Sequence, residues 1–149
     1  MSIIKAKMPL LARHEGTWAG TYRFITPQMK LLDQYDFRIN VTFPDEGKGG
    51  ITYRQESFYT WPNGNQRDLA FEGTYDAGKV VFADRISGSI TELDDRTLNV
   101  HFWFIDQPDV DVCEAIHLGA NNQDRARTWH WFKNGKLFQL TLVDEVRVA

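Results

Sequence analysis

Short connectors between strand-like runs constrain the fold of this chain more than any other feature. Alternating or aromatic-rich runs, typical of strands, occur at 16–25, 35–43, 50–61, 66–75, 79–86, 87–92, 97–105, 110–118, 124–133 and 136–148. Several connectors have the length and composition of hairpin turns, namely PNGN at 62–65, DAG at 76–78, LDDR at 93–96, DQPD at 106–109 and KNGK at 133–136. No stretch between the runs offers the helix that a parallel crossover needs. The sequence therefore predicts an all-β, antiparallel, up-and-down fold with roughly ten strands.

Only the N-terminal segment looks helical. Residues 8–14 suit a short helix, because Pro9 fits a first turn and Gly16 follows the expected end. An up-and-down sheet has two free edges, and closure into a barrel hides both. A length of 149 residues is typical of one domain. We therefore expect residues 1–149 to form a single barrel domain with a short N-terminal helix.

Composition limits the partners and the compartment. The formal net charge is −3 and the Lys and Arg residues do not cluster, which argues against a nucleic-acid partner. The apolar stretch in MSIIKAKMPLL is too short for a secretory signal or a membrane span, so we expect a cytoplasmic protein with no membrane partner. The single cysteine, Cys113, excludes an intrachain disulfide and is expected in the core, as free cysteines usually are.

The NG pair at 134–135 predicts which side chains of the last hairpin share a face, because a two-residue turn fixes the register. Arg127 would lie at the end of the apolar face. The members of that face would be Trp129, Trp131, Phe138, Leu140 and Leu142. His130 would lie on the opposite, solvated face.

The NG pair at 63–64 predicts that two charges lie on an apolar face. A two-residue turn there pairs Phe58 with Leu69, and it places Arg54 and Glu56 on the same face as Phe71. Unpaired charges in an apolar interior cost several kcal/mol, about 3–5, so they persist when they bind a ligand or each other. The alternative is that the register is different and both charges face solvent.

The DQPD loop sets the register of a third hairpin. A four-residue loop places Phe102 and His117 on the apolar face and pairs His101 with Glu114 on the other face. A carboxylate beside an imidazole suits proton transfer, although such a cross-strand couple is more often a surface ion pair.

The N-terminal motif EGTWAGTY, after a short helix, resembles the opening of the calycin barrels, which include lipocalins, fatty-acid-binding proteins and nitrobindins. Gly16 and Trp18 fill the Gly-x-Trp pattern of their first strand. In lipocalins a basic residue from the last strands packs across this tryptophan; the register favours Arg127 for that role, and Arg147 looks more like the fatty-acid-binding pattern. The chain is also similar to uncharacterised lipocalin-like bacterial proteins. The resemblance implies a barrel with a cavity open at one end.

Whether the protein binds a cofactor must be judged from its own residues, because members of the calycin group differ in the ligands that they bind. The absence of a signal peptide and a disulfide argues against a secreted lipocalin, and no nitrobindin-like haem ligand is present. The four histidines, at 14, 101, 117 and 130, lack a zinc-binding spacing such as HExxH. We therefore expect no cofactor and no metal.

The inward-facing residues of such a barrel are the candidates for function. The candidate ligand-binding residues are Trp18, Tyr22, Arg54, Phe58, Phe71, Phe102, Arg127, Trp129 and Trp131. If the protein is an enzyme, Glu56 is the candidate acid or base, with His117 and Arg54 as further catalytic candidates. The simpler alternative is that the aromatic residues only fill a small barrel.

Three functions follow from these candidates. The first is binding of a small hydrophobic molecule, aromatic or acyl, that carries an anionic or polar group. The second is a cofactor-independent lipocalin-fold enzyme, such as a lyase, isomerase, hydratase or cyclase, that moves protons in the same cavity. The third is a homodimer that uses an aromatic surface as its interface.

Overall fold

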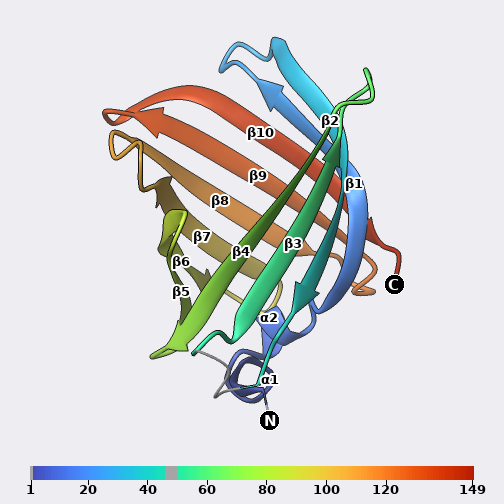
Figure 1. The fold of residues 1–149 in the computed structure, drawn as a ribbon, viewed down its shortest axis with the longest axis vertical. Coiled ribbons are helices and arrows are strands. Elements are labelled where there is room, and N and C mark those ends of the chain that lie inside the picture. The colour runs from blue at the N-terminus through green and yellow to red at the C-terminus, as the bar shows by residue number, and fades with distance from the viewer. Residues whose placement is uncertain (1, 46–49) are drawn as a thin grey trace.

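The structure is a computed structural model that describes residues 2–45 and 50–149. Two short helices, α1 (Ile3–Lys7) and α2 (Pro9–Ala12), precede the strands. The strands are β1 (Gly16–Ile25), β2 (Leu31–Thr42), β3 (Tyr53–Thr60), β4 (Gln66–Asp76), β5 (Lys79–Ala83), β6 (Ile86–Glu92), β7 (Thr97–Phe104), β8 (Val110–Leu118), β9 (Asp124–Lys133) and β10 (Lys136–Arg147). Each strand pairs antiparallel with the next, and β1 also pairs with β10, so the sheet closes into a barrel (Figure 1). The predicted all-β, up-and-down barrel is confirmed.

The helical segment begins earlier than predicted and has two parts. Helix α1 is not predicted from the sequence because it opens with two β-branched isoleucines, which have low helix propensity. Tertiary packing overrides that preference, since Ile4 is fully buried, and the Ser2 hydroxyl accepts a hydrogen bond from the Lys5 amide to cap the first turn. No helix in the described part of the chain has the length and apolar character needed to cross a membrane.

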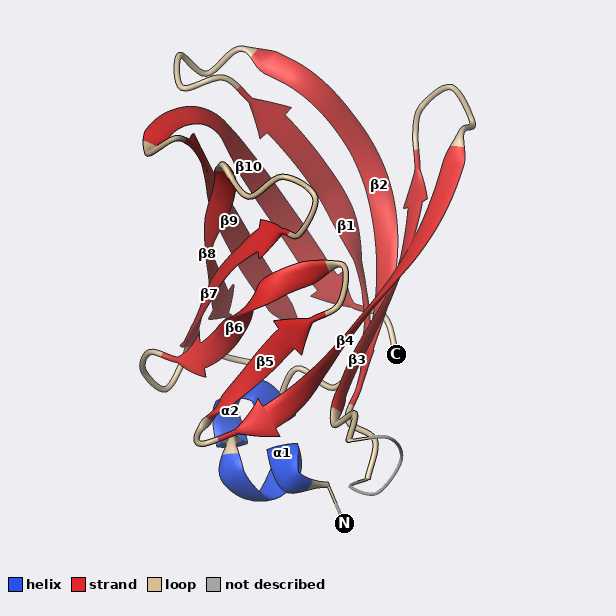
Figure 2. Ribbon diagram, turned by 60° about the vertical axis from the view of Figure 1, so that its left-hand side comes forward, coloured by secondary structure: helices blue, strands red, loops and turns tan. Residues whose placement is uncertain are grey.

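The two helices cover one end of the barrel, and the β1–β2, β3–β4 and β9–β10 turns lie at the opposite end, which we call the hairpin end (Figures 1 and 2). Trp18 is fully buried at the covered end and donates a hydrogen bond from its indole nitrogen to the His14 carbonyl oxygen at 3.0 Å. The guanidinium groups of Arg147 and Arg125 lie 4.4 and 4.5 Å from the centre of its ring. The basic residues that pack across Trp18 are therefore these two, and the preference for Arg127 is wrong.

Gly20 lets the first and last strands approach each other closely. A Cβ atom built at this position would overlap the carbonyl oxygen of Asp144 on β10. Only glycine lacks that atom, so Gly20 is needed where β1 closes the barrel against β10.

His14 is buried beside the same arginines and must stay neutral. Its Nδ1 lies 2.9 Å from an Arg125 guanidinium nitrogen, which can only donate, so Nδ1 is the acceptor and the ring proton is on Nε2. Burial, and then the charge of Arg125, lower the pKa of His14 to about 2.

Acid should therefore destabilise the protein through His14. Between pH 2 and 6.5 the unfolded state binds a proton that the folded state does not, so stability falls as the pH falls through this window. We expect the free energy of unfolding to drop by about 2 kcal/mol between pH 7 and pH 5, measured by urea denaturation at each pH. His14→Gln should flatten this slope and the exposed His117→Gln should leave it unchanged; an equal slope in all three proteins would contradict the assignment.

The barrel wall is incomplete between β4 and β5. Pairing between these strands is limited to Thr74–Asp76 of β4 with Lys79–Val81 of β5. The rest of β4 pairs with β3, and the β3–β4 hairpin leans away from β5 and β6 (Figure 2). Side chains beside this gap, among them Leu69 and Phe71 of β4 and Phe82 of β5, line the barrel interior.

A β-bulge changes the predicted face of β10. Phe132 pairs with Leu137 as predicted, but the register then shifts, so that Trp131 pairs with Gln139 and Trp129 with Thr141. Beyond the bulge the side chains change faces: Thr141 is fully buried and Leu142, predicted inside, is exposed. The positions of Trp129 and Trp131 on the inner side of β9 are unaffected.

The β3–β4 turn is longer than the predicted two residues, which shifts the register by one. Residues 61–65 form the loop, closed by hydrogen bonds from the Trp61 amide to the Asn65 carbonyl and from the Gly64 amide to the Trp61 carbonyl. Arg54 consequently pairs with Glu72 and Phe58 with Asp68. The prediction that Arg54, Glu56 and Phe58 face the interior is wrong.

The β7–β8 register also differs by one residue. His101 pairs with Cys113, and Glu114 pairs with Val100. Glu114 therefore faces the interior, whereas Cys113 and His117, both predicted on the apolar face, lie outside and are exposed. Phe102 faces inward as predicted.

Candidate functional site

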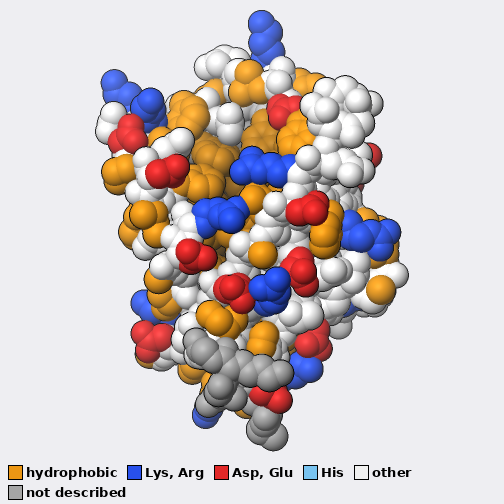
Figure 3. Space-filling view, viewed as in Figure 1, with side chains coloured by type: hydrophobic (Ala, Val, Ile, Leu, Met, Phe, Trp, Pro, Cys, Tyr) orange, Lys and Arg blue, Asp and Glu red, His pale blue; other side chains and the backbone are white. Residues whose placement is uncertain are grey.

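The barrel encloses a cavity of about 540 Å³ that reaches toward the hairpin end. Figure 3 shows this side of the molecule hollowed in its upper part, with hydrophobic side chains inside the hollow and Lys or Arg side chains across its opening. Six of the residues singled out in the sequence line the cavity: Tyr22, Phe71, Phe102, Arg127, Trp129 and Trp131. Seven further aromatic residues join them: Phe24, Tyr35, Tyr53, Tyr59, Trp61, Phe82 and Phe104.

The other singled-out residues lie elsewhere. Trp18 is in the covered end below the cavity. Arg54 forms ion pairs on the outer surface with Glu72 at 3.0 Å and Glu56 at 3.7 Å. His117 lies outside with its Nδ1 3.2 Å from the Thr97 hydroxyl, and Phe58 is also on the outer face. None of these five residues lines the cavity.

The aromatic residues form two adjoining ring clusters along the cavity wall. In one, Trp129 stacks on Trp131 at 5.7 Å between ring centres, and Trp131 stacks on Phe104 at 6.1 Å. In the other, Tyr35 lies 4.4 Å from Trp61 and 5.3 Å from Tyr22. Flat faces of this kind bind planar apolar groups by stacking and by burial of apolar area.

The deep end of the cavity carries a buried charge cluster centred on Arg127. Its Nε donates to Glu145 at 2.6 Å, one terminal nitrogen donates to the Tyr22 hydroxyl at 2.7 Å, and the other lies 3.4 Å from Glu114. Arg125 lies 2.9 Å from the second oxygen of Glu145. Two cations thus face two carboxylates, and Arg127 has no charge left over for an anionic ligand.

Glu114 is the carboxylate of this cluster that also lines the cavity. Burial raises the pKa of Glu114, and the charge of Arg127 opposes that rise. Burial likewise raises the pKa of Tyr22 well above its ordinary value, so Tyr22 stays a phenol. The cluster therefore places a carboxyl that protonates more readily than usual at the wall of an apolar cavity.

Neither carboxylate of the cluster is among the cavity residues predicted from the sequence. The predicted register, which is one residue off, puts Glu114 on the outer face, and no pattern in the sequence marks Glu145 as a site residue. A signal was present, because Glu114 lies between Val112 and Ile116 at the spacing of two that marks one strand face.

The mouth of the cavity carries unpaired cations. Arg67 and Arg85 both line the cavity and are exposed, and neither forms an ion pair within the described residues. Asp33, also at the mouth, accepts hydrogen bonds from the Trp61 indole and the Gln34 amide. No histidine, cysteine or methionine is found in the described lining, so a metal or haem inside would depend on oxygen ligands.

Comparison with known proteins gives the architecture. No family model matches the sequence, and no curated protein matches it. Three solved structures are similar to it over most of its length. A DUF3598-family protein of unknown function from Nostoc punctiforme has a TM-score of 0.69 and 20% identity, over 93% of this chain and 49% of that one. The S-type phycobiliprotein lyase from Guillardia theta has a TM-score of 0.69 and 16% identity, over 100% of this chain and 94% of that one, and the Mycobacterium tuberculosis protein Rv2717c has a TM-score of 0.64 and 11% identity, over 98% of this chain and 97% of that one. The chain thus spans about half the length of the DUF3598 protein. The closed ten-stranded barrel and these neighbours fit a calycin-like β-barrel.

Proposed function

We propose that this protein binds a small, flat, largely apolar molecule with an anionic group inside the barrel. The observation that carries the proposal is the cavity itself, about 540 Å³ in volume, with stacked aromatic rings along its wall. Ligand pockets are typically about 300–1,000 Å³ and are mostly apolar with a few polar groups that set orientation.

The charges set the orientation of the ligand. The deep arginines, Arg125 and Arg127, already face Glu145 and Glu114, so an anion there would meet no free cation. Arg67 and Arg85 at the mouth form no ion pair within the described residues, although the carboxylates of Asp33 and Asp106 also line the cavity. The apolar part of the ligand therefore lies along Trp129 and Trp131, and its anionic group lies at the mouth.

Two naphthalene probes that differ in one group test this orientation. We expect anilinonaphthalene sulfonate, which is anionic, to bind the wild-type protein more tightly than neutral N-phenyl-1-naphthylamine. The double variant Arg67→Gln/Arg85→Gln should weaken sulfonate binding by about tenfold or more, the loss expected for charge-assisted hydrogen bonds, and should leave the neutral probe unchanged. Fluorescence titration measures both affinities.

The matched control is Arg38→Gln, which removes an exposed arginine on the outer face of β2. It should leave the affinity of both probes unchanged. An equal loss of both probes in the mouth variant, or the same loss in the control, would contradict the proposed orientation.

A second candidate function is acid–base catalysis in the same cavity, and Glu114 is the observation that favours it. Its raised pKa and its place at the cavity wall suit a general acid, with Arg127 and Tyr22 beside it. The phycobiliprotein lyase among the structural neighbours supports the view that such a barrel can carry a lyase.

Glu114→Gln separates binding from catalysis. Mass spectrometry identifies the molecules that copurify with the protein, and the test compares how fast the wild type and Glu114→Gln convert them. In an acid–base enzyme Glu114→Gln lowers turnover by on the order of a hundredfold with little change in affinity, because the acid acts only in the transition state. Glu56→Gln, on the outer surface, is the control and should change neither; unchanged turnover in Glu114→Gln would remove Glu114 from a catalytic role.

A further inference from the structure

Three strands bring metal-binding side chains together on the outer face of the barrel. His101 on β7 pairs with Cys113 on β8, and Cys113 pairs with His130 on β9. The three residues therefore form one row across neighbouring strands, and all three are exposed. Neighbouring strands are about 4.8 Å apart, so the two histidines lie roughly 10 Å apart with the cysteine between them.

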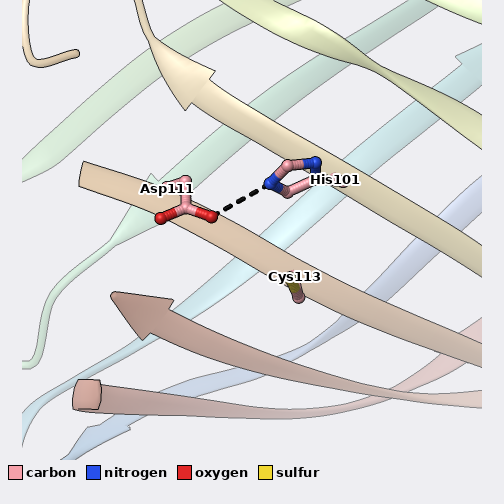
Figure 4. A group of neighbouring side chains, drawn as sticks. All are labelled: His101, Asp111 and Cys113. Atoms are coloured by element: carbon pink, nitrogen blue, oxygen red, sulfur yellow. Dashed lines mark hydrogen bonds and ion pairs between the residues drawn. The ribbon is translucent and has the colours of Figure 1, made fainter. Parts of the chain in front are cut away.

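A carboxylate completes the group. Asp111 lies two residues before Cys113 on the same face of β8, and its Oδ2 is 3.0 Å from His101 Nε2. The donor atoms of His101, Asp111 and Cys113 all lie within 4.8 Å of one another. Figure 4 shows the His101 ring directed across from β7 toward Asp111, with Cys113 further along β8.

We propose that His101, Asp111 and Cys113 form a binding site for Zn²⁺, with His130 as the fourth ligand. Sulfur, imidazole nitrogen and carboxylate oxygen are the donors that Zn²⁺ takes in tetrahedral sites, at about 2.0–2.3 Å. Mg²⁺ and Ca²⁺ prefer oxygen donors alone, so the thiol and the imidazoles select against them. The metal ion takes the place of the hydrogen that now joins His101 to Asp111.

The fourth ligand requires a side-chain rotation. The His130 ring now lies over Phe132 on the same strand, at 6.4 Å between ring centres. Because His130 is exposed and pairs directly with Cys113, rotation about its first side-chain torsion directs the imidazole toward the thiol without any change in the backbone.

This site departs from the expectation of no metal drawn from the sequence. The ligands come from three strands and are separated by up to 29 positions, from His101 to His130, so no short motif marks them. The site is also independent of the cavity, because Cys113 and Glu114 are consecutive residues that point to opposite faces of β8.

Cobalt titration of the tag-free, reduced protein tests the site. Co²⁺ should give the intense visible bands of tetrahedral coordination together with a thiolate-to-cobalt charge-transfer band, and an equimolar amount of Zn²⁺ should remove both. Cys113→Ser should abolish the charge-transfer band, and His101→Gln should weaken Zn²⁺ binding by at least about tenfold. His130→Gln should weaken binding and shift the visible bands, because one protein ligand is lost.

His117→Gln is the matched control, since His117 is also exposed on β8 but lies outside the group. It should leave the spectrum and the affinity unchanged. Octahedral cobalt spectra without a charge-transfer band, or Zn²⁺ binding that persists unchanged in Cys113→Ser/His101→Gln, would overturn the proposal.

Discussion

Replacing Glu145 by alanine is expected to lower the free energy of unfolding by about 3–5 kcal/mol. Glu145 is buried and its two oxygens contact Arg127 at 2.6 Å and Arg125 at 2.9 Å. Removal of the carboxylate leaves two buried guanidinium groups with one remaining carboxylate, Glu114, which contacts Arg127 at 3.4 Å. Breaking one side of a buried ion pair is costly because the remaining charge has lost both water and partner.

The adjacent residue supplies the control. Asp144 points outward on β10 and forms an exposed ion pair with Arg23 at 2.7 Å, so Asp144→Ala should cost less than about 1 kcal/mol. Urea denaturation measures both variants. If Glu145→Ala fails to fold, Glu145→Gln, which keeps one acceptor oxygen, should fold with an intermediate loss of stability; equal costs for the Glu145 and Asp144 variants would refute the role of the buried cluster.

Filling the cavity with an indole is expected to weaken ligand binding by about a hundredfold or more, because a ligand would have to displace a packed side chain. Val100 on β7 lines the cavity and pairs with Glu114, and Val100→Trp places the new ring inside the cavity. Gln55→Trp does the same from β3. The affinity of N-phenyl-1-naphthylamine, which senses the apolar part of the site alone, is the measurement.

Asn99→Trp is the matched control for the cavity variants. Asn99 precedes Val100 on β7 and is exposed on the outer face, so the same side chain is added outside the barrel. The control should bind the probe as the wild type does. Undiminished probe binding by folded Val100→Trp and Gln55→Trp proteins would show that the probe does not occupy the cavity.

The strand count and the closed barrel could be predicted because they depend on local signals. Alternation of apolar and polar residues marks each strand, and hairpin turn sequences mark most connections. The start of β2 at Leu31 was placed four residues late, because Leu31 and Leu32 are both exposed and break the alternation. Similarly, α1 depends on the burial of Ile4 by the rest of the barrel, which no local pattern shows.

Register could not be predicted with the same success, because one residue of loop length or one bulge changes the face of a whole strand. The bulge after Leu137 moved Thr141 inside, and the five-residue loop at 61–65 moved Arg54 and Glu56 outside. Tyr22, Trp129 and Trp131 were placed inside because their own strands alternate clearly. The charged part of the site therefore had to come from the structure, and Glu114, Arg67 and Arg85 replace Glu56, His117 and Arg54 as candidates.

We propose that a flat apolar anion binds in the cavity and not on the outer surface of the barrel. A crystal structure of the protein with anilinonaphthalene sulfonate tests this most directly. We expect the naphthalene ring to lie against Trp129 and Trp131 and the sulfonate to lie within hydrogen-bond distance of Arg67 or Arg85. A probe bound only to the outer surface, or a sulfonate placed at the deep end beside Glu114, would contradict it.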